Sequence, residues 1–188
     1  AGIAFGVYHS ILDWRHPDAL AGRIRAYRDN YLFPQVQELI ENYHPKIMWF
    51  DGDWQSGWSD ADARALYNLC ISLDPEIIVN DRVKRWMSNP GDYMTPEQEI
   101  PEKPLQRPWE SCQTINWNWG YNKNDNSWKT PATLVHMLLE TVSKGGNLLL
   151  NVGPTAEGII PAPSVDRLKA MGGWLEQYGE TVYGSIQS

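Results

Sequence analysis

Two carboxylates follow an apolar run in the sequence WFDGDW at residues 49–54. The apolar residues 47–50 predict a buried strand, which places Asp51 at the C-terminal tip of that strand. Ligands bind at this end of the strands in α/β barrels and open α/β sheets, so an acid there is a candidate for catalysis. The alternative is an Asx turn that closes the strand, and Asp53, two residues later, fits such a turn or cap.

Further polar side chains follow the other apolar runs or lie in the long segment after residue 83. They are Tyr8, His9, Asn80, Asp81, Arg82, Asp92, Glu97, Glu99 and Glu110. Hydrolysis of a glycosidic bond uses two carboxyl groups, one as nucleophile or base and one kept protonated as the acid. Aromatic neighbours would stack on a sugar and raise the pKa of the acid by desolvation. These residue types together favour glycoside hydrolysis.

The composition limits the class of ligand. Ten tryptophans in 188 residues are unusual for one domain, and flat aromatic faces stack well on sugars. The net charge of -7, with Lys and Arg scattered singly, argues against a nucleic-acid partner. No run of about 18 apolar residues predicts a membrane span. The two cysteines do not make a disulfide framework.

Strands and helices alternate along the chain. Apolar runs predict strands at residues 3–10, 47–50, 77–80 and 148–150, and apolar stripes predict helices at 27–43, 60–73, 131–144 and 164–178. Residues 11–26 are expected to form a loop, and Asp60 and Thr130 are expected to cap the helices that follow them. The segment 83–129 has no strong periodicity and is expected to hide a strand near 114–117 or around Tyr93.

This alternation predicts an α/β fold with a parallel sheet and right-handed crossovers. About four or five βα units amount to half to two-thirds of an eight-stranded (β/α)8 (TIM) barrel. An open doubly wound sheet also fits this number, but no glycine-rich phosphate loop follows the first strand. We therefore expect a single α/β domain over residues 1–188, built as an incomplete barrel.

Seven motifs occur in one order over nearly the whole chain. They are YHS at 8–10 with Trp14, WFDG at 49–52, NDR at 80–82, TPE at 95–97, WE at 109–110, WGY at 119–121 and GGNLLLNVGP at 145–154. Together they resemble the α-L-fucosidases of glycoside hydrolase family 29. The sequence GETVY at 179–183 is similar to the end of that family's catalytic domain. The resemblance implies an enzyme that hydrolyses terminal α-L-fucosyl linkages of glycans.

The resemblance also implies a retaining mechanism. Asp51 corresponds to the carboxylate nucleophile, which forms a covalent fucosyl-enzyme. Asp53 is the rival for this role, although its place after a glycine favours a loop or cap residue. The motif at 95–97 assigns the acid/base role to Glu97, while Glu99 and Glu110 remain alternatives. Glu110 is equally compatible with a structural hydrogen-bonding role.

Four further residues correspond to the sugar-binding residues of the family: Tyr8, Trp49, Arg82 and Trp119. The planar donor fork of Arg82 suits sugar hydroxyls and the charge of Asp51. Trp119 matches an aromatic residue that lies against the fucose methyl group, and plain core packing remains an alternative for Trp49. The family needs no metal for its chemistry, and the four histidines show no metal-ligand spacing. We expect neither a metal nor a cofactor.

The chain departs from the family at its ends. We expect it to be the C-terminal part of the catalytic barrel, without the N-terminal strands and without the C-terminal β-sandwich that many members carry. The sequence at 95–101 resembles the subgroup that prefers α-1,3- and α-1,4-linked fucose. The resemblance suggests a secreted, periplasmic or lysosomal protein whose partner is a fucosylated oligosaccharide or glycoconjugate.

Two other functions remain open at this point. One is a non-catalytic or degenerate fucose-binding barrel fragment that keeps the pocket without turnover. The other is an unrelated α/β enzyme that binds a metal through Asp51 and Asp53.

Overall fold

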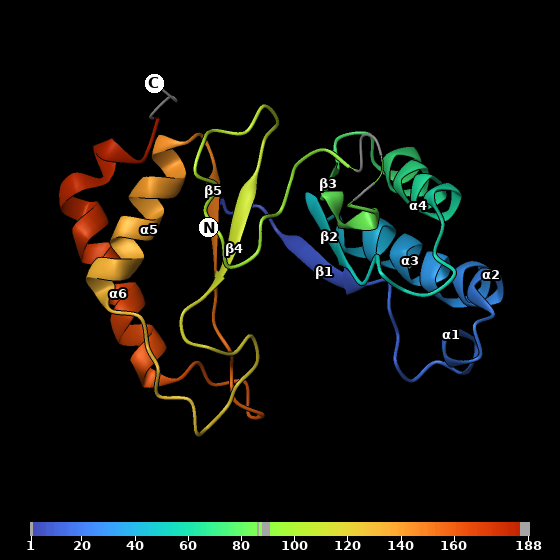
Figure 1. Cartoon of the computed structure of the whole chain (residues 1–188), viewed down its shortest axis with the longest axis horizontal. Coiled ribbons are helices and arrows are strands. Elements are labelled where there is room, and N and C mark those ends of the chain that lie inside the picture. The colour runs from blue at the N-terminus through green and yellow to red at the C-terminus, as the bar shows by residue number, and fades with distance from the viewer. Residues whose placement is uncertain (1, 86, 88–90, 185–188) are drawn as a thin grey trace. The chain divides into compact units, whose positions relative to one another are not determined.

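The structure of the chain, a computed structural model, describes residues 2–85, 87 and 91–184, so Trp86 lies outside the described residues. All paired strands among these residues are parallel (Figure 1). This confirms the predicted α/β class. The chain divides into two compact units, Ala1–Met94 and Thr95–Ser188, each described by itself below, and a single domain over 1–188 stays a prediction. No described helix is long and apolar enough to cross a membrane.

The first unit contains a parallel sheet with the strand order β1-β2-β3. Its strands are β1 (Gly6–Ser10), β2 (Ile47–Asp51) and β3 (Ile78–Val79). From β1 to β2 the chain forms α1 (Pro17–Leu20), α2 (Ile24–Tyr27), the π-helical turn η1 (Arg28–Leu32) and α3 (Phe33–Tyr43). The connection from β2 to β3 is α4 (Asp60–Leu73), and the 3-10 turn η2 (Asp81–Val83) follows β3.

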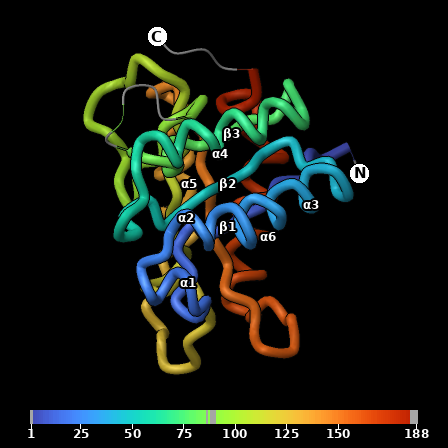
Figure 2. Tube along the Cα trace, turned by 90° about the vertical axis from the view of Figure 1, so that its right-hand side faces the viewer, coloured from blue at the N-terminus to red at the C-terminus, as the bar shows by residue number. Residues whose placement is uncertain are grey.

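The two faces of β2 have different surroundings, because successive side chains of a strand point to opposite sides. Met48 and Phe50 are fully buried in the hydrophobic core that the sheet forms with α3 and α4. These two helices contact each other and run side by side (Figure 2). Trp49 and Asp51 project from the other face, where Tyr8 of β1 is in register with Trp49. Burial of one face therefore fixes the direction in which Asp51 points.

Two local predictions for this unit are wrong. Residues 11–26 are not a loop throughout, because His16 caps α1 by accepting a backbone hydrogen bond and α2 begins at Ile24. Helices of four residues are too short to show an apolar stripe in the sequence. Ser59 caps α4 in place of Asp60, since its hydroxyl takes part in a capping box.

The second unit contains a parallel sheet of β4 (Glu110–Thr114) and β5 (Asn147–Asn151). They are joined through α5 (Pro131–Ser143), and α6 (Ala162–Tyr178) and the 3-10 turn η3 (Gly179–Thr181) follow β5. Thr130 caps α5 as predicted, by accepting a hydrogen bond from the Thr133 backbone N–H. The strand hidden in 83–129 is β4, which ends at Thr114, whereas Tyr93 forms an isolated bridge with Asn80 of the first unit.

The indole of Trp109 packs closely against Gly146, just before β5. Trp109 is buried, and its Nε1 donates a hydrogen bond to the Lys144 carbonyl oxygen over 3.3 Å. A Cβ atom on residue 146 would lie 2.4 Å from the Trp109 ring, closer than non-bonded atoms approach. A residue without a side chain is therefore required at this contact.

We expect Gly146→Ala to lower the free energy of unfolding by about 1–3 kcal/mol, because the buried indole has to shift. Gly173→Ala is the matched control. Gly173 lies inside α6, nothing lies within 4 Å of its added Cβ, and alanine favours a helix by about 0.5–1 kcal/mol. Urea unfolding of both variants tests this, and an unchanged midpoint for Gly146→Ala would contradict the packing argument.

Candidate active site

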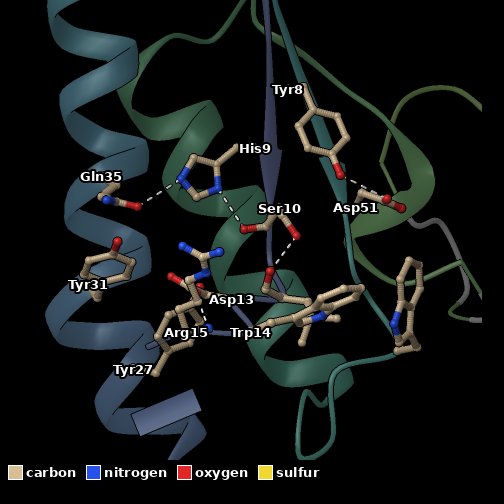
Figure 3. A pocket seen from close by; sticks show the side chains of 12 residues that line it. Tyr8, His9, Ser10, Asp13, Trp14, Arg15, Tyr27, Tyr31, Gln35 and Asp51 are labelled. Atoms are coloured by element: carbon tan, nitrogen blue, oxygen red, sulfur yellow. Dashed lines mark hydrogen bonds between the residues drawn. The ribbon is translucent and has the colours of Figure 1, made fainter. Parts of the chain in front are cut away.

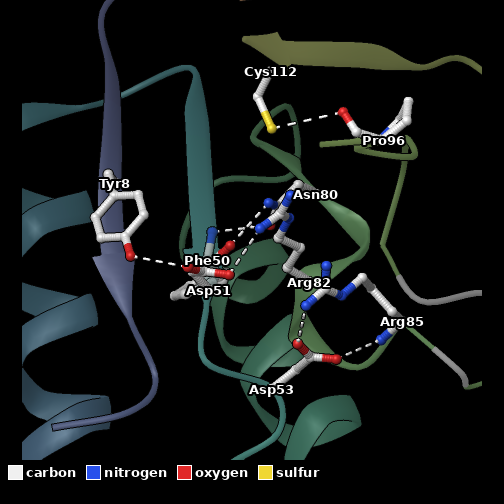
Figure 4. Close-up of polar contacts among 9 residues, drawn as sticks. All are labelled: Tyr8, Phe50, Asp51, Asp53, Asn80, Arg82, Arg85, Pro96 and Cys112. Atoms are coloured by element: carbon white, nitrogen blue, oxygen red, sulfur yellow. Dashed lines mark hydrogen bonds and ion pairs between the residues drawn. The ribbon is translucent and has the colours of Figure 1, made fainter. Parts of the chain in front are cut away.

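The carboxylate of Asp51 lies at the C-terminal tip of β2, and both of its oxygens accept hydrogen bonds. Arg82 Nη1 donates to Asp51 Oδ1 over 3.0 Å, and the Tyr8 hydroxyl donates to Oδ2 over 3.1 Å (Figure 4). The Arg82 side chain is 3% exposed and that of Asp51 is 20% exposed. This ion pair is therefore shielded from water and stronger than an ordinary surface pair.

Trp49 contacts both donors. The ring centroids of Tyr8 and Trp49 are 5.6 Å apart with 23° between their planes, and Arg82 Cζ lies 4.5 Å from the centre of the Trp49 ring. Stacking and cation–π contacts of this kind favour one arrangement of the side chains. The structure thus brings together four of the predicted site residues, and it positions their acid, Asp51, between a cation and a hydroxyl.

Asn80 holds the backbone that carries Asp51. Its side-chain amide donates to the Phe50 carbonyl oxygen and accepts from the Phe50 backbone N–H, each over 2.9 Å. These bonds extend the pairing of β2 beyond the end of β3 at Val79. The sequence predicts that Asn80 lies at a strand exit but indicates no role for it. The signal for this contact is an Asn directly after an apolar strand.

The 3-10 turn η2 carries Arg82 and is fixed on both sides. Trp58 Nε1 donates to the Val83 carbonyl oxygen over 2.8 Å, and the Asp81 backbone N–H donates to the Tyr93 carbonyl oxygen over 2.9 Å. Trp58 and Val83 are both buried. Arg82 therefore reaches Asp51 from a turn that is anchored in the core.

Tyr8 keeps its proton at neutral pH. Desolvation, and then the negative charge of Asp51 and the hydrogen bond to it, raise the pKa of Tyr8 to about 12. The phenol is therefore a donor to Asp51 under ordinary conditions.

His9, the next residue, contacts α3, the helix that carries Gln35. Its Nε2 lies 3.2 Å from Gln35 Oε1, and burial lowers the pKa of its imidazole. His9 therefore has a structural setting.

Two other acids of the predicted cluster have structural partners. Asp53 is buried; it accepts a hydrogen bond from the Arg85 backbone N–H over 3.0 Å and lies 3.2 Å from the Arg85 guanidinium (Figure 4). Asp92 accepts from the Val79 backbone N–H and from the Tyr67 hydroxyl, each over 2.8 Å. The described residues contain no group of three or more His, Cys, Asp or Glu placed to hold a metal ion.

Glu97 and Trp119 belong to the second unit. Glu97 is exposed and forms an isolated bridge with Cys112, so its backbone lies along β4. Trp119 is 39% exposed, and its carbonyl oxygen accepts a hydrogen bond from the Asn151 side chain over 2.7 Å at the end of β5. Each side chain therefore comes from a segment that is anchored to a strand of this unit.

A family model described as Alpha-L-fucosidase matches residues 1–180. The chain belongs to the α-L-fucosidase family. The α-L-fucosidase of Dictyostelium discoideum is 34% identical to it over 201 residues, which cover 98% of this chain and 43% of that protein. The chain thus spans less than half the length of this fucosidase. The match confirms the family that the seven motifs predict.

Solved fucosidase structures have the same fold over the length of the chain. Isoenzyme 1 from Paenibacillus thiaminolyticus has a TM-score of 0.89 and 34% identity, and the match covers all of this chain and 52% of that one. A fucosidase from Bacteroides thetaiotaomicron has a TM-score of 0.84 and 29% identity, with 99% of this chain and 49% of that chain covered. About half of each of these fucosidase structures therefore shares the fold of this chain.

Replacing Asp51 by Asn is expected to lower the pKa of Tyr8 from about 12 toward its ordinary value. Removing the negative charge makes the phenolate less unfavourable, so the proton leaves at lower pH, while desolvation keeps part of the shift. A spectrophotometric titration of tyrosine ionisation measures this, with a Tyr8→Phe variant subtracted in each background. An unchanged titration would contradict the hydrogen bond between Tyr8 and Asp51.

Proposed function

We propose that the protein is a retaining exo-glycosidase that releases terminal α-L-fucosyl groups from glycans. The observation that carries this proposal is the Asp51 carboxylate at the tip of β2, bound through one oxygen to Arg82 and through the other to Tyr8. Asp51 attacks the anomeric carbon and forms a covalent fucosyl-enzyme as the bond to the leaving oxygen breaks. Water then hydrolyses this ester and regenerates the carboxylate.

Glu97 is the proposed acid/base residue. It gives a proton to the leaving oxygen in the first step and takes one from water in the second. Tyr8, Trp49, Arg82 and Trp119 are the proposed contacts to the fucosyl group. Arg82 offers hydrogen-bond donors to both the nucleophile and sugar hydroxyls, and the aromatic rings offer faces for the apolar side of the sugar. No metal or cofactor takes part.

A relative supports the covalent route. The structure from Bacteroides thetaiotaomicron is described as a trapped covalent intermediate of a fucosidase of glycoside hydrolase family 29 with 2-fluoro-fucosyl fluoride. A covalent intermediate in a protein with this fold is consistent with a carboxylate nucleophile at the end of β2.

We also infer that residues 1–188 belong to one (β/α)8-like catalytic domain. The parallel strands and their helical connections fit part of such a barrel, and the chain covers about half of the solved fucosidases that it matches. From the sequence at 95–101 we propose a preference for α-1,3- and α-1,4-linked fucose. A secreted, periplasmic or lysosomal location rests on the family alone.

Trapping tests the nucleophile. We expect 2-fluoro-fucosyl fluoride to lose its anomeric fluoride and to add the mass of one 2-fluoro-fucosyl group to the complete gene product, on the peptide that contains Asp51. Asp51→Asn should lose this label and at least about a thousandfold of the activity, because an amide side chain cannot form the fucosyl ester. The matched control is Asp60→Asn, at an exposed acid in the first turn of α4, which should keep both.

Two results would contradict the assignment. A label on Asp53 would transfer the role to that acid. Binding of fucose without any label or turnover would favour the non-catalytic fucose-binding protein.

Leaving-group dependence tests the acid/base residue. We expect Glu97→Gln to lower kcat/KM by about 10²–10⁴-fold for a fucosylated oligosaccharide, whose leaving group needs a proton. The loss should be much smaller for a dinitrophenyl fucoside, whose leaving group does not. The exposed Glu102→Gln serves as the control. If Glu99→Gln or Glu110→Gln shows this pattern and Glu97→Gln does not, the role belongs to that residue.

A further inference from the structure

A pocket of about 570 Å³ opens beside Asp51 within the first unit (Figure 3). Tyr8 and Asp51 line it together, and the lining continues along the loops that follow β1 and β2 to Trp14 and Trp54. Pockets that hold drug-sized ligands have volumes of about 300–1,000 Å³. This pocket therefore offers more room than one six-carbon sugar fills.

Trp14 is presented on a loop with a fixed backbone. The Ile11 backbone N–H donates to the Asp51 carbonyl oxygen over 2.6 Å, which continues the pairing of β1 and β2. On the other side of Trp14, Asp13 Oδ1 accepts hydrogen bonds from the backbone N–H groups of Arg15 and His16, over 2.8 and 3.1 Å. Trp14 is 74% exposed. A loop held by these hydrogen bonds thus presents a large, solvent-exposed aromatic residue to the pocket.

Trp54 lies on the neighbouring loop, which is pressed against the first. Gly52 has a φ of 86°, and a Cβ atom there would lie 2.6 Å from both the backbone nitrogen and the Cβ of Leu12. The loop after β2 therefore has to keep its position relative to the loop after β1. Trp54 is 58% exposed, and Arg85 Cζ lies 5.6 Å from its ring. The pocket has two exposed indoles on two fixed loops.

We propose that this pocket binds the saccharide to which the fucosyl group is attached, with Trp14 as its main stacking face and Trp54 as a second one. The proposal rests on the proposed fucosidase function. The reaction needs only the Asp51 end of the pocket, so the space beyond it is available to the rest of the substrate. Loops at the C-terminal ends of parallel strands form the rim through which a glycan extends away from the reacting bond.

The chemistry of the lining also fits a saccharide. Sugar rings combine apolar C–H faces with hydroxyls on their edges, and they bind where flat aromatic faces alternate with polar groups. Asp13, Arg15 and Gln35 supply carboxylate, guanidinium and amide groups between the aromatic residues of the pocket. The hydroxyls of a saccharide can form further hydrogen bonds with these polar groups, whereas the hydrocarbon chain of a lipid cannot.

The test compares two substrates in the complete gene product. Fucosyl fluoride has no sugar as its leaving group, whereas a fucosylated trisaccharide reaches beyond the reacting bond. We expect Trp14→Ala to lower kcat/KM for the trisaccharide about tenfold and to change the rate with fucosyl fluoride less than about twofold. Trp14→Phe should recover part of the loss. Tyr43→Ala, at an exposed aromatic residue outside the pocket, should change neither rate.

The outcomes separate the two proposals. Equal losses on both substrates, or no loss on either, would overturn the assignment of the pocket. If the unaltered protein hydrolyses neither substrate, the proposed function fails. Binding of the fucose-free disaccharide, followed by NMR, then decides the pocket alone: loss of binding in Trp14→Ala supports it, and equal binding by both proteins overturns it.

Discussion

The two hydrogen bonds between the Asn80 side chain and the backbone of Phe50 are the constraint on which the site depends. β3 ends at Val79, so the amide of Asn80 takes the place of the next pair in the ladder and holds the tip of β2. Asp51 follows the held residue directly. Arg82 follows Asn80 by two residues, so one short segment both fixes the acid and delivers the cation that binds it.

Burial explains why these groups remain together. Removing a guanidinium from water costs several kcal/mol unless an anion and further contacts compensate. Arg82 is almost fully buried, and Asp51 and the face of Trp49 provide that compensation. On the other side of β2, Met48 and Phe50 are packed into the core. A rotation of β2 would expose two core residues and would leave the buried Arg82 cation without its anion. The hydrophobic core and the ion pair therefore favour the same arrangement.

The features that the sequence predicts are those marked by a pattern of neighbouring residues. An apolar run followed by an acid placed Asp51 at a strand tip, and the Thr130-Pro131 pair marked the start of α5. The Asn80 contact could not be predicted, because it joins residues 30 apart and depends on where β3 ends. The short helices α1 and α2 lack a periodic stripe, and the pocket depends on two loops meeting at Gly52.

The donors on Asp51 have a consequence for the second half of the proposed reaction. When the carboxylate becomes an ester it loses its charge, and Arg82 and Tyr8 then face a weaker acceptor. Their interaction energy returns as the ester is cleaved and the anion re-forms. In the proposed reaction, Arg82 and Tyr8 therefore also make Asp51 a better leaving group, which favours hydrolysis of the covalent intermediate.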